Sequence, residues 1–124
     1  MKRIIAPVFL ALLTPMLAQA ADPPLFHLAV KDVPVENGKL LDIEFNEVER
    51  TPDSSTVQIV RRAGGSVSSS MFVVRGMCGL ARARGQQYVA GERVDKEHMI
   101  VTFLKAPPER DKGFTMAQCE LLRY

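Results

Sequence analysis

The residues that decide the fold are FHLAVK at positions 26–31 and LDIEF at positions 41–45, with Asn37-Gly38 between them. In both stretches apolar residues occupy every second position, a period that is typical of a strand with one buried face. Asn-Gly is the strongest short hairpin signal, because both residues tolerate a positive φ. The sequence therefore predicts an antiparallel hairpin here, and Pro34 places its first strand at an edge of the sheet.

Strand patterns continue through the rest of the chain, and turn residues such as Pro52-Asp53 and Gly64-Gly65 separate them. The four consecutive apolar residues at 71–74 indicate a strand that is buried on both faces. The chain shows no alternation of strand and helix patterns, so a doubly wound nucleotide-binding fold is excluded. We expect a mainly β fold of about seven strands: a single small antiparallel domain, either a sandwich or a partly open barrel. The further strands are expected at 56–61, 70–75, 87–94, 98–105 and 114–122.

One segment, residues 76–85, fits two structures. Met77, Leu80 and Ala81 are spaced as on one face of a helix, and Gly85 would be a suitable helix end. Residues 80–84 alternate equally well as a strand, and the glycines in this segment weaken either regular element. We expect one short helix near residues 77–84 or an irregular crossover, and the strand stays open as an alternative.

The first 20 residues have the pattern of a cleaved secretory signal peptide. Lys2 and Arg3 precede an apolar run at 4–17, and Ala18-Gln19-Ala20 supplies the small residues that a signal peptidase requires. The run is shorter than the roughly 20 residues that a membrane span needs. We therefore expect residues 21–124 to form a single exported domain, periplasmic or secreted, without a membrane span after cleavage.

The sequence contains two cysteines, Cys78 and Cys119, and the predicted signal directs both to a compartment where thiols oxidise. Thiol redox enzymes usually have two residues between their two cysteines, so that one cysteine lowers the pKa of the other. These two are 41 positions apart. The sequence predicts a structural disulfide between them.

The charges are unevenly distributed along a mature chain that is neutral overall. Loss of Lys2 and Arg3 reduces the 16 basic residues to 14, which equals the number of acidic residues. The segment 22–53 is acid-rich, whereas 54–91 has arginines and no acid. These arginines could bind an anionic partner, or they could pair with the acid-rich first third of the chain. The candidate residues are Arg61, Arg62, Arg75, Arg82 and Arg84.

Residues that could support catalysis are present, but they do not form a known pattern. His27 and His98 lack a metal-ligand spacing, and no serine lies in a Gly-x-Ser-x-Gly elbow. Asp42 and Glu44 share one strand face, as outward polar residues on a half-solvated sheet do. We therefore expect no catalytic residue, no metal and no cofactor. A neutral, exported chain also disfavours nucleic acid as a partner.

These observations favour a non-enzymatic binding or structural domain that contacts another envelope or extracellular macromolecule. The partner would be a protein, an anionic glycan or a lipid. A small secreted enzyme inhibitor is the alternative, with a rigid loop at 85–91 or 95–97 presented to a catalytic cleft. A small hydrolase is the third possibility.

Overall fold

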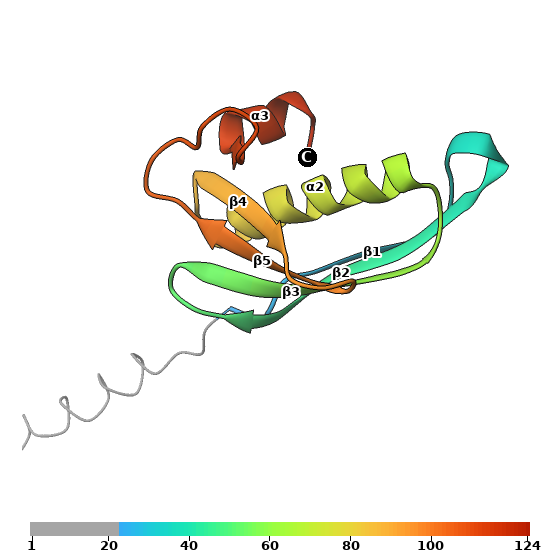
Figure 1. The fold of residues 1–124 in the computed structure, drawn as a ribbon, viewed down its shortest axis with the longest axis horizontal. Coiled ribbons are helices and arrows are strands. Elements are labelled where there is room, and N and C mark those ends of the chain that lie inside the picture. The colour runs from blue at the N-terminus through green and yellow to red at the C-terminus, as the bar shows by residue number, and fades with distance from the viewer. Residues whose placement is uncertain (1–22) are drawn as a thin grey trace, which may run out of the picture.

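The computed structural model describes residues 23–124, so the predicted signal peptide at 1–20 lies outside the described residues. The domain is mainly β: six antiparallel strands form one curled sheet, a half-barrel, in the order β1-β2-β3-β5-β4-β6. Figure 1 shows the long helix α2 lying across the concave face of this sheet. The elements are β1 (His27–Pro34), η1 (Glu36–Gly38), β2 (Leu40–Arg50), β3 (Ser54–Ala63), α2 (Ser66–Ala83), β4 (Tyr88–Arg93), β5 (His98–Phe103), β6 (Phe114–Thr115) and α3 (Met116–Leu121).

The predicted first hairpin is confirmed. β1 pairs antiparallel with β2, and β1 is the edge strand that Pro34 indicated. Both turn residues have positive φ, 58° at Asn37 and 71° at Gly38. The pairing register shifts between Val30 and Val33, so the edge strand carries a bulge. A bulge and a proline both disfavour pairing of this edge with another strand.

The strand predicted at residues 70–75 is wrong, because this segment lies inside the 18-residue helix α2. Ser69, Phe72, Gly76 and Leu80 are buried, and their spacing of three and four residues is that of one helix face. Of the four apolar residues at 71–74, only Phe72 is buried. The short helix expected near 77–84 is the C-terminal half of this longer helix.

Two glycines explain how α2 approaches the sheet so closely. A Cβ atom at Gly76 would lie 2.5 Å from the Phe45 ring, and one at Gly79 would lie 2.7 Å from the Phe26 ring. These two rings pack edge to face, with their centroids 6.0 Å apart. The glycines that weakened the helix prediction are therefore the residues that allow the helix to pack on the sheet.

The strand predicted at 114–122 is also wrong for most of its length, since only Phe114 and Thr115 form a strand. Helix α3 follows because Thr115 and Gln118 form a capping box. The Gln118 N–H donates to Thr115 Oγ1 at 3.1 Å, and the Thr115 N–H donates to Gln118 Oε1 at 2.9 Å. The Thr-x-x-Gln spacing was the sequence signal for this helix.

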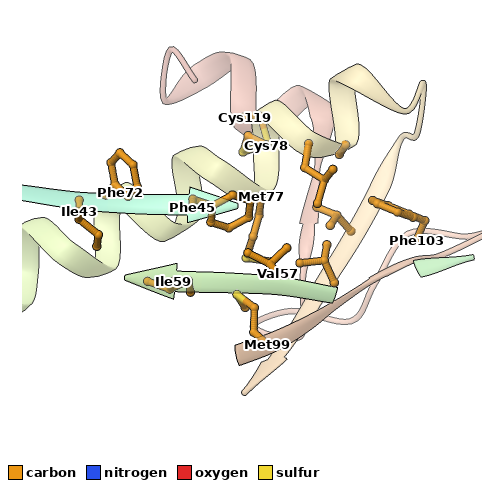
Figure 2. Close-up of a cluster of buried hydrophobic side chains, with 14 of the residues drawn as sticks. Ile43, Phe45, Val57, Ile59, Phe72, Met77, Cys78, Met99, Phe103 and Cys119 are labelled. Carbon is orange, nitrogen blue, oxygen red and sulfur yellow. A yellow bond between two sulfur atoms is a disulfide. The ribbon is translucent and has the colours of Figure 1, made fainter. Parts of the chain in front are cut away.

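The core lies between α2 and the concave face of the sheet (Figure 2). Ile43, Phe45 and Val57 have no exposed surface, and Phe72 and Met77 of α2 pack in the same cluster. The predicted disulfide is confirmed: Cys78 of α2 is bonded to Cys119 of α3, and both residues are fully buried. The disulfide therefore connects the C-terminal helix to the long helix inside the core.

Candidate functional site

Three of the five candidate arginines have partners within the chain: Arg62, Arg82 and Arg84. Arg62 lies 2.6 Å from Glu44 and 3.4 Å from Asp42, and this guanidinium holds the pKa of Glu44 below its ordinary value. Arg84 donates to the main-chain oxygens of Thr51 at 2.6 Å and Ser54 at 2.8 Å. The pairing of an arginine with the acid-rich first third, one of the two expectations, is observed at Arg62.

Arg82 and Arg84 do not converge on one point. Arg82 lies in the last turn of α2 and donates to the main-chain oxygen of Tyr124, whereas Arg84 follows the helix and covers the Phe103 ring. Residues two apart on a helix point in different directions. On a strand, Arg82 and Arg84 would have shared one face and could have contacted one anion. At the end of α2 they do not share a face.

The Arg61 and Arg75 side chains have no hydrogen bond or ion pair within residues 23–124. They belong to different surfaces. Arg61 lines a cleft between β3 and α2, and Arg75 lines a groove on another flank of α2. The five arginines therefore lie at different surfaces and have different partners. A joint role for them in anion binding stays a prediction.

The cleft at Arg61 gathers three cationic side chains from two distant parts of the sequence. Arg61 comes from the end of β3, and Arg93 and Lys96 come from the hairpin that joins β4 to β5. We call it the cationic cleft; its volume is about 580 Å³. Its lining consists of Ile43, Ile59, Val60, Arg61, Ser66, Ser69, Ser70, Val73, Arg93, Lys96 and Glu97.

The cationic cleft combines an apolar floor with a polar mouth. Ile43 and Ile59, both buried, lie in the sheet beneath it. Arg61, Arg93 and Lys96 are exposed, and Glu97 contributes the one carboxylate of the lining. The lining therefore has a net charge of about plus two at neutral pH, since lysine, arginine and glutamate are all ionised there.

The hairpin turn that carries Lys96 is held by Asp95. Its Oδ1 accepts the main-chain N–H groups of Glu97 and His98, both at 2.8 Å, and the hydrogen bond from Glu97 is the main reason that the pKa of Asp95 is lowered. Arg93 Nη1 donates to the Lys96 main-chain oxygen at 2.9 Å. The segment 95–97 is thus a constrained turn, as the inhibitor alternative requires. Most of the other proposed loop, 85–91, belongs to β4.

Sequence reasoning missed Arg93 and Lys96 because they lie in a segment of balanced charge. They reach Arg61 only through the pairing of β3 with β5, which places the main-chain oxygen of Glu97 2.6 Å from the Ile59 nitrogen. That contact joins positions 38 apart in the sequence. The Asp-Lys-Glu turn between two strand patterns was a signal for the hairpin, but it did not indicate which strand would lie beside it.

A buried carboxylate, Glu47, was missed as well. It lies on the inward face of β2 and is 3% exposed. Arg50 donates to it at 2.6 and 2.9 Å, the Ser55 hydroxyl at 2.5 Å, and the Phe26 N–H at 2.9 Å. Burial raises the pKa of Glu47, but the hydrogen bonds from Arg50, Ser55 and Phe26 outweigh it and lower the pKa to about 2. With all these partners, Glu47 is a structural group that joins β2 to β3 and to Phe26, the residue before β1.

The low pKa of Glu47 predicts a loss of stability in acid. The folded protein holds this carboxyl at a pKa of about 2 against an ordinary value of 4.5. Its contribution, about 3 kcal/mol, is complete above pH 4.5 and disappears as the pH falls towards 2. Denaturant unfolding between pH 7 and pH 2.5 should show this decline. Glu47→Gln should have a shallower acid dependence; an identical one would contradict the assignment.

The part of the chain that the structure describes, residues 23–124, holds no group of three or more His, Cys, Asp or Glu that could hold a metal ion. In the same residues, no helix has the length and apolar character needed to cross a membrane. Comparison of the chain with protein-family models, curated proteins and solved structures found no match. The cationic cleft therefore has to be interpreted from its own chemistry.

Proposed function

We propose that this protein is an exported, non-enzymatic binding domain that holds an anionic group of an envelope or extracellular component in the cationic cleft. One observation carries the proposal: Arg61, Arg93 and Lys96 line the same cleft, and the Arg61 and Lys96 side chains have no hydrogen bond or ion pair within residues 23–124. Guanidinium and ammonium groups bind carboxylate and phosphate oxygens through charge-assisted hydrogen bonds.

The form of the cleft supports a ligand rather than a solvated surface. Its volume of about 580 Å³ falls within the range of roughly 300 to 1,000 Å³ that is usual for ligand sites. The hydroxyls of Ser66 and Ser70 are exposed along its α2 wall. An anionic ligand with a partly apolar body, such as an acidic sugar or a lipid headgroup with its glycerol, would match this combination.

Two further features support the remaining parts of the proposal. Disulfides persist in oxidising compartments, so the Cys78–Cys119 bond supports export of the chain. The absence of a catalytic signature in the sequence supports a binding role over an enzymatic one. Cleavage after Ala20 is part of the proposal, and N-terminal sequencing of exported protein would identify Ala21 as the first residue.

We expect the double substitution Arg61→Glu and Lys96→Glu to weaken anion binding by at least about tenfold, because two charge-assisted contacts are lost and two repulsions are introduced. The probes are polygalacturonate and vesicles that contain phosphatidylglycerol. Binding to the unmodified protein should also weaken steeply as salt rises through the physiological range. Thermal stability should change little, since exposed charges contribute about 0 to 1 kcal/mol each.

The matched control is Lys105→Glu with Arg110→Glu, which changes the same net charge at exposed residues beyond the far end of β5. It should retain most of the binding. Binding of one probe alone identifies the source of the anion as glycan or lipid. Absence of binding to both probes, or equal loss in the control, contradicts the proposal. A stable one-to-one complex with a hydrolase, unaffected by the cleft variant, would favour the inhibitor alternative instead.

A further inference from the structure

A second hollow, on the opposite flank of α2, has a different chemistry from the cationic cleft. The two hollows use different positions of the helix: Ser66, Ser69, Ser70 and Val73 for the cleft, Val67, Ser68, Met71, Phe72 and Arg75 for the second. This second hollow, the apolar groove, has a volume of about 330 Å³. Its lining consists of Val30, Val33, Val35, Leu41, Val67, Ser68, Met71, Phe72, Arg75 and Tyr124.

Several large apolar side chains in this groove are open to solvent. Val67 is 67% exposed, Met71 is 43% exposed and Val33 is 39% exposed. Single exposed apolar residues are common on protein surfaces, but a contiguous group of them indicates a binding surface. Here β1 and β2 form one wall of the groove and α2 forms the other, so a ligand would be contacted on two sides.

A single free charge lies at one end of the groove. Val67, Met71 and Arg75 are four residues apart and follow one stripe of α2, which extends about 12 Å at 1.5 Å per residue. Arg75 is exposed, and its side chain has no hydrogen bond or ion pair within residues 23–124. The other polar side chains that line the groove are Tyr124 and Ser68. The Ser68 hydroxyl already donates a hydrogen bond to the Glu36 carboxylate.

We infer that the apolar groove binds a fatty acid, with its alkyl chain along Val67 and Met71 and its carboxylate at Arg75. An alkyl chain needs no hydrogen bonds, whereas a buried peptide needs partners for every N–H and C=O group. The polar side chains of this groove are too few to supply them. The carboxylate complements the guanidinium of Arg75, which can bind both of its oxygens. The site is separate from the cationic cleft and does not depend on it.

The test is binding of dodecanoate, below its micelle concentration, to the purified domain by titration calorimetry. We expect saturable one-to-one binding. Met71→Glu places a carboxylate in the groove, four residues before Arg75 on the same stripe of α2. This carboxylate would pair with Arg75 and repel the carboxylate of the ligand, so the variant should weaken dodecanoate binding at least about tenfold. Ile100→Glu is the matched control, since Ile100 is 39% exposed on β5 and lies outside the groove. It should bind dodecanoate as the unmodified protein does.

A second variant examines the charge separately. Arg75→Gln should weaken dodecanoate binding about tenfold and leave dodecanol binding nearly unchanged, because only the acid uses a charge-assisted contact. Equal effects on acid and alcohol would overturn the assignment of the carboxylate to Arg75. Absence of saturable binding would overturn the proposal, as would a dimer that Met71→Glu dissociates, because a second copy would then be the occupant.

Discussion

Glu47→Ala should lower the free energy of unfolding by about 3 to 5 kcal/mol, the range for removal of one partner from a buried ion pair. The substitution leaves the Arg50 guanidinium, the Ser55 hydroxyl and the Phe26 N–H without their shared acceptor. Arg50 is only partly exposed, so water replaces the lost carboxylate incompletely. The loss should be measured by urea unfolding at pH 7.

The matched control is Glu49→Ala, two positions along the same strand at an exposed side chain. Surface substitutions of this kind usually change stability by less than about 0.5 kcal/mol. Glu47→Gln should fall between the two, because the amide keeps one acceptor oxygen and loses the charge. Equal stability of the Glu47→Ala and Glu49→Ala variants would show that the network around Glu47 does not stabilise the fold.

The same network reaches one of the candidate arginines. Ser55 donates to Glu47 and accepts a hydrogen bond from Arg84 Nη1 at 3.0 Å. Arg84 also covers the Phe103 ring, with its guanidinium carbon 4.8 Å from the ring centroid. These contacts make Arg84 a packing residue, and they explain why a charge pattern alone could not separate it from Arg61.

Replacement of both Cys78 and Cys119 by alanine should cost about 4 kcal/mol of stability. The disulfide closes a loop across 41 sequence positions, and the chain-entropy model gives roughly this value for a loop of that length. The bond also holds α3 against α2 in the core, so amide hydrogens of α3 should exchange faster in the variant. Denaturant unfolding and hydrogen exchange measure the two effects.

The unmodified protein in reductant should reproduce the double alanine variant, because both lack the covalent link. A free thiol pair leaves two buried polarisable groups, so the reduced protein can be slightly more stable than the alanine variant. Unchanged unfolding in reductant, with the thiols shown to be free, would contradict a structural role for the bond.

The local signals in the sequence were sufficient for five of the seven predicted strands and for the disulfide. Alternation in 41–45 and Asn37-Gly38 determine the first hairpin, and the Asp-Lys-Glu turn determines the hairpin of β4 and β5. Each of these two hairpins depends on residues close together in the chain. The run at 71–74 failed as a signal because a stretch of apolar residues fits a buried strand and a buried helix equally well.

The outcome for α2 was decided by packing. Gly76 and Gly79 are unfavourable in an isolated helix, but they admit the rings of Phe45 and Phe26, and the burial of these rings outweighs the helix propensity. Tertiary contacts also decide the burial of Glu47. It follows Phe45 on the inward face of β2, and only its three donors make burial of a carboxylate favourable.

The sequence by itself therefore determined the strand periodicity, the first hairpin and the cysteine pair, since each depends on spacing along the chain or on residue count. The tertiary structure alone decided that Arg61, Arg93 and Lys96 line one cleft, that partners within the chain hold Arg62 and Arg84, and that Arg75 lines an apolar groove. The physical reason is that strand pairing and helix docking bring together positions tens of residues apart, and no local pattern encodes those contacts.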